Sequence, residues 1–236
     1  LSVRTARYVY AEIGEVIDAR GHDVWRGRAV VPTARKLQLV ARAFWAHMVG
    51  QGGGRIVLTT STGLRGLPGN TAYADHAVSF LNAWASTHTT LTGNADRFLA
   101  SGLYGFGWAA AADIMRTYPG WAAADVTAFQ NYLVNVYYPL QHQFLTSHND
   151  AYITNYWANW DLANIEGMMA VGIFADRQDL YDEAIDYLFT GGGNGALDKA
   201  FYYLHPGNLM QWQESGRDQG HTTLGMGLFG QITQIA

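Results

Sequence analysis

The residues best suited to acid–base chemistry lie in one polar stretch near the end of the sequence. Residues 211–222 read Gln-Trp-Gln-Glu-Ser-Gly-Arg-Asp-Gln-Gly-His-Thr, and an apolar run of helical character follows them. Backbone N–H groups and Arg217 at the start of such a helix can receive an anion. His221 can act as a base near neutral pH. In the alternative interpretation, Glu214 or Asp218 pairs with Arg217, and His221 only caps the following helix.

A second polar constellation lies within residues 154–164, where three asparagines accompany two tryptophans and a tyrosine. Amides inside a helix need hydrogen-bond partners, and a row of them facing a groove could donate to a carboxylate. This pattern indicates substrate-facing roles for Asn159 and Asn164. The alternative is that Asn159 or Asp161 caps the helix that follows. Glu166, inside the same apolar helix, is a third candidate or a structural partner for an arginine.

Several helices must position these side chains. From about residue 71 onward, apolar residues recur at three- and four-residue spacing, which is typical of amphipathic helices. We expect helices over 73–85, 95–118, 121–145, 159–174, 180–189, 194–204 and 219–235, with Pro139 kinking or breaking the third. Two more are expected over 5–19 and 33–49, and only 55–60 has the composition of a strand. The sequence therefore predicts an all-α fold of antiparallel helical hairpins, either a bundle or an (α/α) toroid.

The composition narrows the range of partners. Charged residues make up 14% of the chain, against about 25% in typical proteins, and the formal net charge is −4. We therefore expect no nucleic-acid partner, and no apolar run reaches the roughly 18 residues of a membrane span. The chain has no cysteine, which excludes disulfides and thiol catalysis. The histidines lack metal-ligand spacing, so we expect no metal and no cofactor, with His142 and His148 at the surface or in a groove.

Three segments of the sequence resemble the alginate-lyase-like polysaccharide lyases, a group that includes enzymes acting on alginate and on glucuronan. They are residues 159–164, 167–174 and 214–222, and the run Glu-Ser-Gly-Arg-Asp-Gln-Gly-His is the most specific part. Residues 73–77 and 81–85 also resemble an early helix pair of these enzymes. The likeness extends from about residue 70 to the C-terminus. It implies a single (α/α) toroid domain over residues 1–236.

The resemblance implies cleavage of a polyuronate, alginate or glucuronan, by β-elimination. A base removes the C5 proton of a uronic acid unit, the O4-linked neighbour leaves, and the new end is a 4,5-unsaturated sugar. The substrate carboxylate must be neutralised meanwhile, and such electrostatic stabilisation is usually the largest catalytic contribution. By analogy, Asn164 or Asn159 would neutralise the carboxylate. His221 would assist in this or act as the base, and Arg217 would bind a carboxylate or hold the loop.

The sugar chain and the proton donor call for further residues. Five residues inside the polar motifs are expected to contact the substrate, and they are Trp160, Trp212, Tyr156, Gln219 and Glu214. Tyr and Trp suit this role because they combine an apolar face with a polar tip, although core packing is the plainer interpretation for most aromatic residues of the chain. For the proton-transferring tyrosine, the local candidates are Tyr156, Tyr202 and Tyr203, and their spacing selects none of them.

Two other classes of protein remain open at this stage. The same residues could form a carbohydrate-binding module without catalysis, or a structural helical domain whose polar loop is a packing device. The sequence stops inside an apolar helix, which predicts a C-terminally truncated family member with part of its site in later helices. The resemblance further implies a secreted or periplasmic enzyme with an anionic polysaccharide as its partner. The oligomeric state stays open.

Overall fold

The structure, a computed structural model, describes Ala19, residues 71–207 and residues 209–236. The chain divides into two compact units, residues 1–77 and residues 78–236. The prediction of one domain over the whole chain stays a prediction. Three expected elements lie outside the described residues, apart from the helical Ala19, and these are the helices 5–19 and 33–49 and the strand 55–60.

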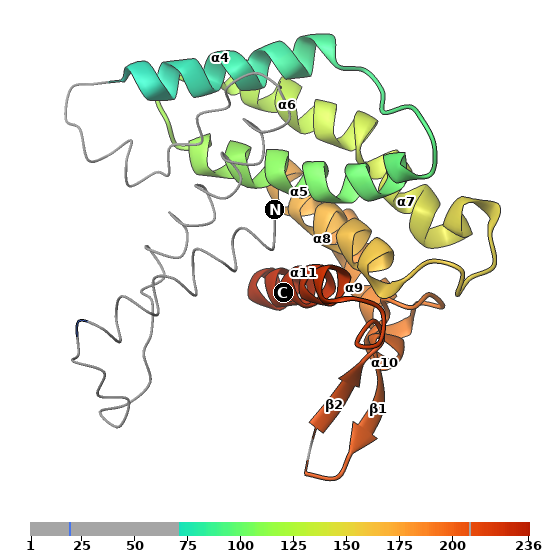
Figure 1. Ribbon diagram of the computed structural model, residues 1–236. Coiled ribbons are helices and arrows are strands. Elements are labelled where there is room, and N and C mark those ends of the chain that lie inside the picture. Colours follow the sequence, from blue (N-terminus) through green and yellow to red (C-terminus); the bar gives the residue numbers. More distant parts are fainter. Residues whose placement is uncertain (1–18, 20–70, 208) are drawn as a thin grey trace. The chain divides into compact units, whose positions relative to one another are not determined.

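The described part of the chain is mostly helical, which confirms the predicted class (Figure 1). Its elements in order are α4 (Ala72–Thr87), α5 (Asp96–Met115), α6 (Ala123–Val136), α7 (Tyr138–Ser147), η1 (His148–Asp150), α8 (Ala158–Ala175), α9 (Gln178–Thr190), α10 (Leu197–Ala200), β1 (Phe201–His205), β2 (Leu209–Trp212) and α11 (Gln219–Ile235). Most expected helices are confirmed to within a few residues because their apolar spacing is a local signal. A closed toroid stays a prediction.

The helix predicted over 121–145 is interrupted, as the proline in it suggested. α6 ends at Val136, and α7 begins at Tyr138 with Pro139 in its first turn. Proline lacks the N–H of the helix ladder and is tolerated in the first turn, where that group needs no helical partner. The chain therefore ends one helix before Pro139 and starts another.

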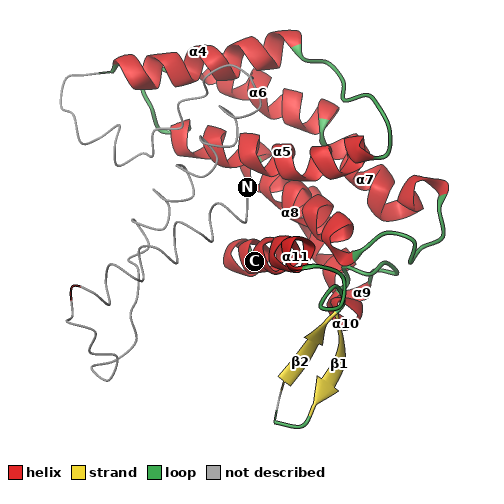
Figure 2. Ribbon diagram, in the orientation of Figure 1, coloured by secondary structure: helices red, strands yellow, loops and turns green. Residues whose placement is uncertain are grey.

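The helix predicted over 194–204 is wrong for most of its length. α10 covers only Leu197–Ala200, and β1 then pairs antiparallel with β2. The run Phe-Tyr-Tyr in β1 favours a pleated backbone, and Gly207 supplies a φ of 84° in the connecting turn. In Figure 2 the hairpin extends away from the helices. Its large exposed side chains are Tyr202, Tyr203, Leu204, Leu209 and Met210.

α8 is the central helix of residues 78–236 and packs against α5, α7, α9 and α11 (Figure 1). Nearly all of its side chains are buried. The approach to α5 is close at two positions because a glycine stands at each of them. A Cβ at Gly102 would lie 2.3 Å from the carbonyl oxygen of Ala163, and one at Gly167 would lie 2.7 Å from the carbonyl oxygen of Gly102. The polar residues in the first turn of α8 are therefore held on a tightly packed core.

Candidate functional site

The polar loop between β2 and α11, residues 213–218, is fastened to the start of α8. Glu214 is 0% exposed, and its carboxylate accepts hydrogen bonds from the backbone N–H of Asn159 (2.8 Å) and from the Asn159 amide (2.7 Å). The Gln213 side-chain oxygen accepts from the backbone N–H of Ala158 (3.2 Å). These N–H groups have no partner within the helix, and a carboxylate also suits the positive end of the helix dipole. Glu214 therefore caps α8, the role that the alternative interpretation of the sequence gave to Asn159 or Asp161.

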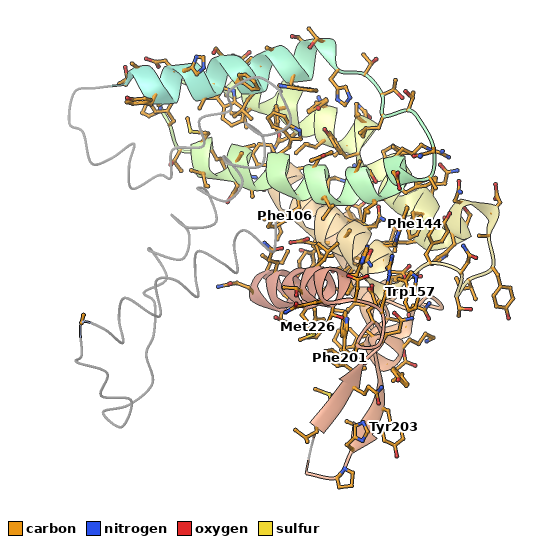
Figure 3. The ribbon with its side chains drawn as sticks, in the orientation of Figure 1. Phe106, Phe144, Trp157, Phe201, Tyr203 and Met226 are labelled. Carbon is orange, nitrogen blue, oxygen red and sulfur yellow. The ribbon has the colours of Figure 1, made fainter. Side chains whose placement is uncertain are left out.

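The guanidinium of Arg217 lies between Glu214 and the ring of Trp157. Its Nη1 is 3.1 Å from Glu214 Oε2, and its Cζ is 4.9 Å from the centroid of the Trp157 ring. The alternative pairing of Arg217 with Glu214 is thus confirmed. Trp157 stands at the start of α8 and is 40% exposed (Figure 3). A guanidinium can pair with a carboxylate, and an indole ring can stack against the apolar face of a sugar ring.

Asp218 caps α11 and orients His221. Its Oδ1 accepts the backbone N–H of His221 (2.9 Å), and its Oδ2 is 2.6 Å from Nδ1 of the imidazole. These hydrogen bonds, the backbone one first, hold the pKa of Asp218 below its usual range. A carboxylate at Nδ1 favours the tautomer with its proton there, which leaves a lone pair on Nε2. No hydrogen bond joins Nε2 to the described part of the chain, so capping and base chemistry are compatible in His221.

Asn164 lies away from the polar loop, in the contact between α8 and α5. It is 0% exposed, and its Oδ1 accepts a hydrogen bond from the Ser101 hydroxyl (3.1 Å). Its Nδ2 donates to the carbonyl oxygen of Trp160 (2.9 Å). Both ends of this amide are therefore engaged inside the core. The structure brings Asn159, but not Asn164, to the loop that carries Arg217.

The other residues expected to contact sugar differ in exposure. Tyr156 and Trp160 are partly exposed, with ring centroids 4.7 Å apart, and both pack against Phe144. Gln219 is exposed in the first turn of α11. Trp212 is only 5% exposed, and its ring packs against Phe201 and Phe229, so it offers no open face for stacking.

Asp161, in the first turn of α8, is the centre of a buried network that spacing did not reveal. Its carboxylate lies 2.8 Å from His148 Nε2 and accepts hydrogen bonds from the Tyr187 hydroxyl (3.2 Å) and the Gly195 N–H (2.8 Å). Burial raises the pKa of Tyr187, so its hydroxyl stays protonated. The expectation of a surface or groove position is wrong for His148, which is 1% exposed. No helical or strand period connects these residues, so no local signal could have found them.

Glu166 has no arginine partner in the described structure, contrary to one of its two interpretations. It is 1% exposed, and no hydrogen bond reaches either carboxylate oxygen. Burial raises the pKa of Glu166 well above its usual range. Burial without a partner therefore favours the neutral form of this carboxyl group inside α8.

Two further properties concern only the parts of the chain that the structure describes. No group of three or more His, Asp and Glu side chains there could hold a metal ion. Among the described helices, none combines the length and the apolar character that crossing a membrane requires.

The comparisons with known proteins point to one family. Residues 55–200 match the family model described as alginate lyase. No curated protein and no solved structure matches the chain. The matched range includes Trp157 and Asn159 at the start of α8, whereas His221 lies beyond it. The match supports a polysaccharide lyase activity in general terms. Because it covers more than half of the chain, this protein belongs to the alginate lyase family.

Proposed function

We propose that this protein cleaves a polyuronate, alginate or glucuronan, by β-elimination and leaves 4,5-unsaturated uronic acid ends. The observation that carries the proposal is the placement of Arg217 over the Trp157 ring, in a loop that leads directly to the oriented imidazole of His221 in the first turn of α11. A uronic acid unit offers the matching features, since it has a carboxylate, an apolar ring face and a weakly acidic proton at C5. Family membership makes this substrate class the first to test.

The proposed reaction begins with charge neutralisation. Arg217 pairs with the uronate carboxylate, which makes the C5 proton more acidic; one such donor contributes about 3 to 4 kcal/mol. His221 takes the C5 proton on Nε2, and the ionised Asp218 stabilises the imidazolium that forms. The electron pair of the C5–H bond forms the C4=C5 double bond. The C4–O4 bond breaks, and the leaving oxygen receives a proton.

The other expected site residues enter the proposal in two groups. Glu214 and Asn159 are positioning residues, because their hydrogen bonds hold the polar loop against α8. Asn164 positions α8 on α5, and Trp212 supports the loop from the core. Three partly or fully exposed residues are proposed to contact neighbouring sugar units, namely Tyr156, Trp160 and Gln219.

The test is the release of unsaturated ends, which absorb in the ultraviolet. The protein is incubated with alginate, with glucuronan and with a neutral polysaccharide, and we expect absorbance to rise with a polyuronate only. Arg217→Ala and His221→Ala should each lower kcat/KM by roughly 100-fold or more. The matched control is His142→Ala, an exposed histidine of α7 that pairs with Glu183, and it should retain activity.

The outcomes separate the candidate functions. If no polyuronate gives absorbing ends although affinity electrophoresis shows binding, the protein is a carbohydrate-binding module. If His221→Ala retains full lyase activity, the class is right but the assigned base is wrong. Under the proposed function the enzyme meets its polymer outside the cytoplasm, so we infer a secreted or periplasmic location.

A further inference from the structure

Three consecutive residues between α7 and α8 have a left-handed backbone. The φ angles of His148, Asn149 and Asp150 are 48°, 55° and 57°. This conformation costs an ordinary residue roughly 1–2 kcal/mol, and His, Asn and Asp adopt it more readily than most. Such a run persists only where surrounding contacts hold it, and strain of this kind clusters at functional sites.

The first residue of the turn is anchored in the core. His148 Nε2 lies 2.8 Å from Asp161 Oδ1 and 3.1 Å from the Tyr187 hydroxyl. Gly193 closes over this group, since a Cβ there would lie 2.6 Å from the same nitrogen of His148. His148 and Asp161 are 1% and 0% exposed. The left-handed turn is therefore fixed to the first turn of α8 and to α9.

The second residue of the turn joins an arginine to a tyrosine. The Asn149 side-chain oxygen accepts a hydrogen bond from Arg97 Nη2 (3.3 Å), and its Nδ2 donates to the Tyr156 hydroxyl (3.1 Å). Because a guanidinium can only donate, Arg97 orients the amide with its NH₂ group toward Tyr156. The phenol oxygen thus accepts a hydrogen bond, and its own proton remains available for donation. A donor at this oxygen also stabilises the phenolate that remains after the proton has left.

The ring of Tyr156 is held as firmly as its hydroxyl. It packs edge-on against Phe144, with centroids 5.0 Å apart, and against Trp160 at 4.7 Å. Tyr156 is partly exposed. The next residue is Trp157, whose ring centroid lies 4.9 Å from the guanidinium carbon of Arg217.

The other two tyrosine candidates lack such support. Tyr202 and Tyr203 are 54% and 53% exposed on the hairpin, where Figure 3 shows Tyr203 beyond the helices. No hydrogen bond from the described residues orients either hydroxyl. The contacts around the phenol therefore single out Tyr156.

We propose that Tyr156 protonates the leaving O4 and that Asn149, held by the left-handed turn, is its positioning residue. The inference rests on the proposed function. His221 takes the C5 proton, the C5–H electron pair forms the double bond, and the C4–O4 pair leaves with O4 and binds the Tyr156 proton. The resulting phenolate is stabilised by the Asn149 amide. The His221 imidazolium then returns a proton to it through water, which restores both groups.

The central experiment replaces Asn149 by glycine, which adopts the left-handed backbone without strain but has no amide. We expect Asn149→Gly to keep its thermal midpoint and KM, while kcat for the polyuronate falls roughly 10- to 100-fold. Tyr156→Phe should lower kcat by about 100-fold or more. In protein labelled at tyrosine Cζ, the NMR resonance of Tyr156, identified with Tyr156→Phe, should shift in Asn149→Gly because the phenol oxygen loses a hydrogen bond.

The matched control is Asp176→Gly, because Asp176 also has a positive φ (56°) but caps the far end of α8. It should leave kcat and the Tyr156 resonance unchanged. Full kcat in Tyr156→Phe, or an unchanged Tyr156 resonance and an unchanged kcat in Asn149→Gly, would overturn the inference. The NMR measurement needs no substrate, so it tests the link between Asn149 and Tyr156 even if the wild type forms no unsaturated ends. That last result would instead overturn the proposed function.

Discussion

The buried carboxyl of Glu166 should make stability depend on pH in the direction opposite to that of a salt-bridged carboxylate. Neither oxygen has a hydrogen-bond partner, and burial raises the pKa of the group well above its usual range. In the unfolded chain, a glutamate loses its proton at a pKa of about 4.3. In the window between these two pKa values, the folded state therefore holds one proton that the unfolded state has lost.

The sign and size of the effect follow from this single proton. The stabilisation is fully present below the unfolded pKa and is lost as pH rises toward the folded pKa, at about 1.4 kcal/mol per pH unit. Glu166→Gln cannot ionise and so does not lose this stabilisation. The difference in free energy of unfolding between Glu166→Gln and the wild type should therefore grow in favour of the variant by that amount for each pH unit in the window. Glu166→Met also removes the unpaired oxygens, which should add roughly 1–3 kcal/mol even in acid.

Urea denaturation at a series of pH values, followed by tryptophan fluorescence, measures these differences. Asp182→Asn is the control, because it removes an exposed carboxylate of α9 that accepts a hydrogen bond from Gln178. Its stability should follow the wild type through the same pH range. If the curves of the wild type and Glu166→Gln run parallel throughout, the carboxyl is not a neutral buried group and the reasoning fails.

Three further predictions concern the packing of the site. Glu214→Ala should lower the free energy of unfolding by roughly 1.5–3 kcal/mol, because two N–H groups of Asn159 lose their acceptor. A thermal unfolding midpoint equal to that of the wild type, measured by circular dichroism, would contradict this cap. Gly102→Ala should lower the free energy of unfolding by roughly 1–3 kcal/mol, because the new Cβ would lie 2.3 Å from the Ala163 carbonyl oxygen. Calorimetry of the variant measures this, and an unchanged melting temperature would contradict so close a contact between α5 and α8. Trp157→Ala should raise KM for the polyuronate roughly threefold to tenfold with a smaller change in kcat, and initial rates at several substrate concentrations would expose an unaltered KM.

The helices could be predicted because their signals are local. Apolar spacing predicted residues 219–235, which are the bounds of α11, and Pro139 predicted the break between α6 and α7. The hairpin of β1 and β2 could not be predicted from such local spacing, because a strand is stabilised by its partner and not by its own period. Periodicity also could not say which face of α8 would be open, since this helix is buried almost all round.

Part of the candidate site could be predicted as well. The sequence indicated that Arg217 could pair with Glu214, which is three positions away. It also indicated that His221 stands at a helix start, because an apolar run of helical character follows it. It did not single out Trp157, whose exposed ring lies under Arg217, and it placed Trp212 in the groove rather than the core. Exposure is set by what the rest of the chain covers, so residue type and spacing are weak guides to it.

By itself the sequence determined the helical class, the family likeness and the residues capable of the chemistry, since each depends on residue types within a few positions of one another. Only the tertiary structure decided that Glu214 caps α8 at Asn159 and that Asn149 reaches Tyr156 from a left-handed turn. It also decided that Asn164 belongs to the contact with α5. These outcomes rest on hydrogen bonds that close only when distant segments pack together, and no local pattern encodes which donor will meet which acceptor.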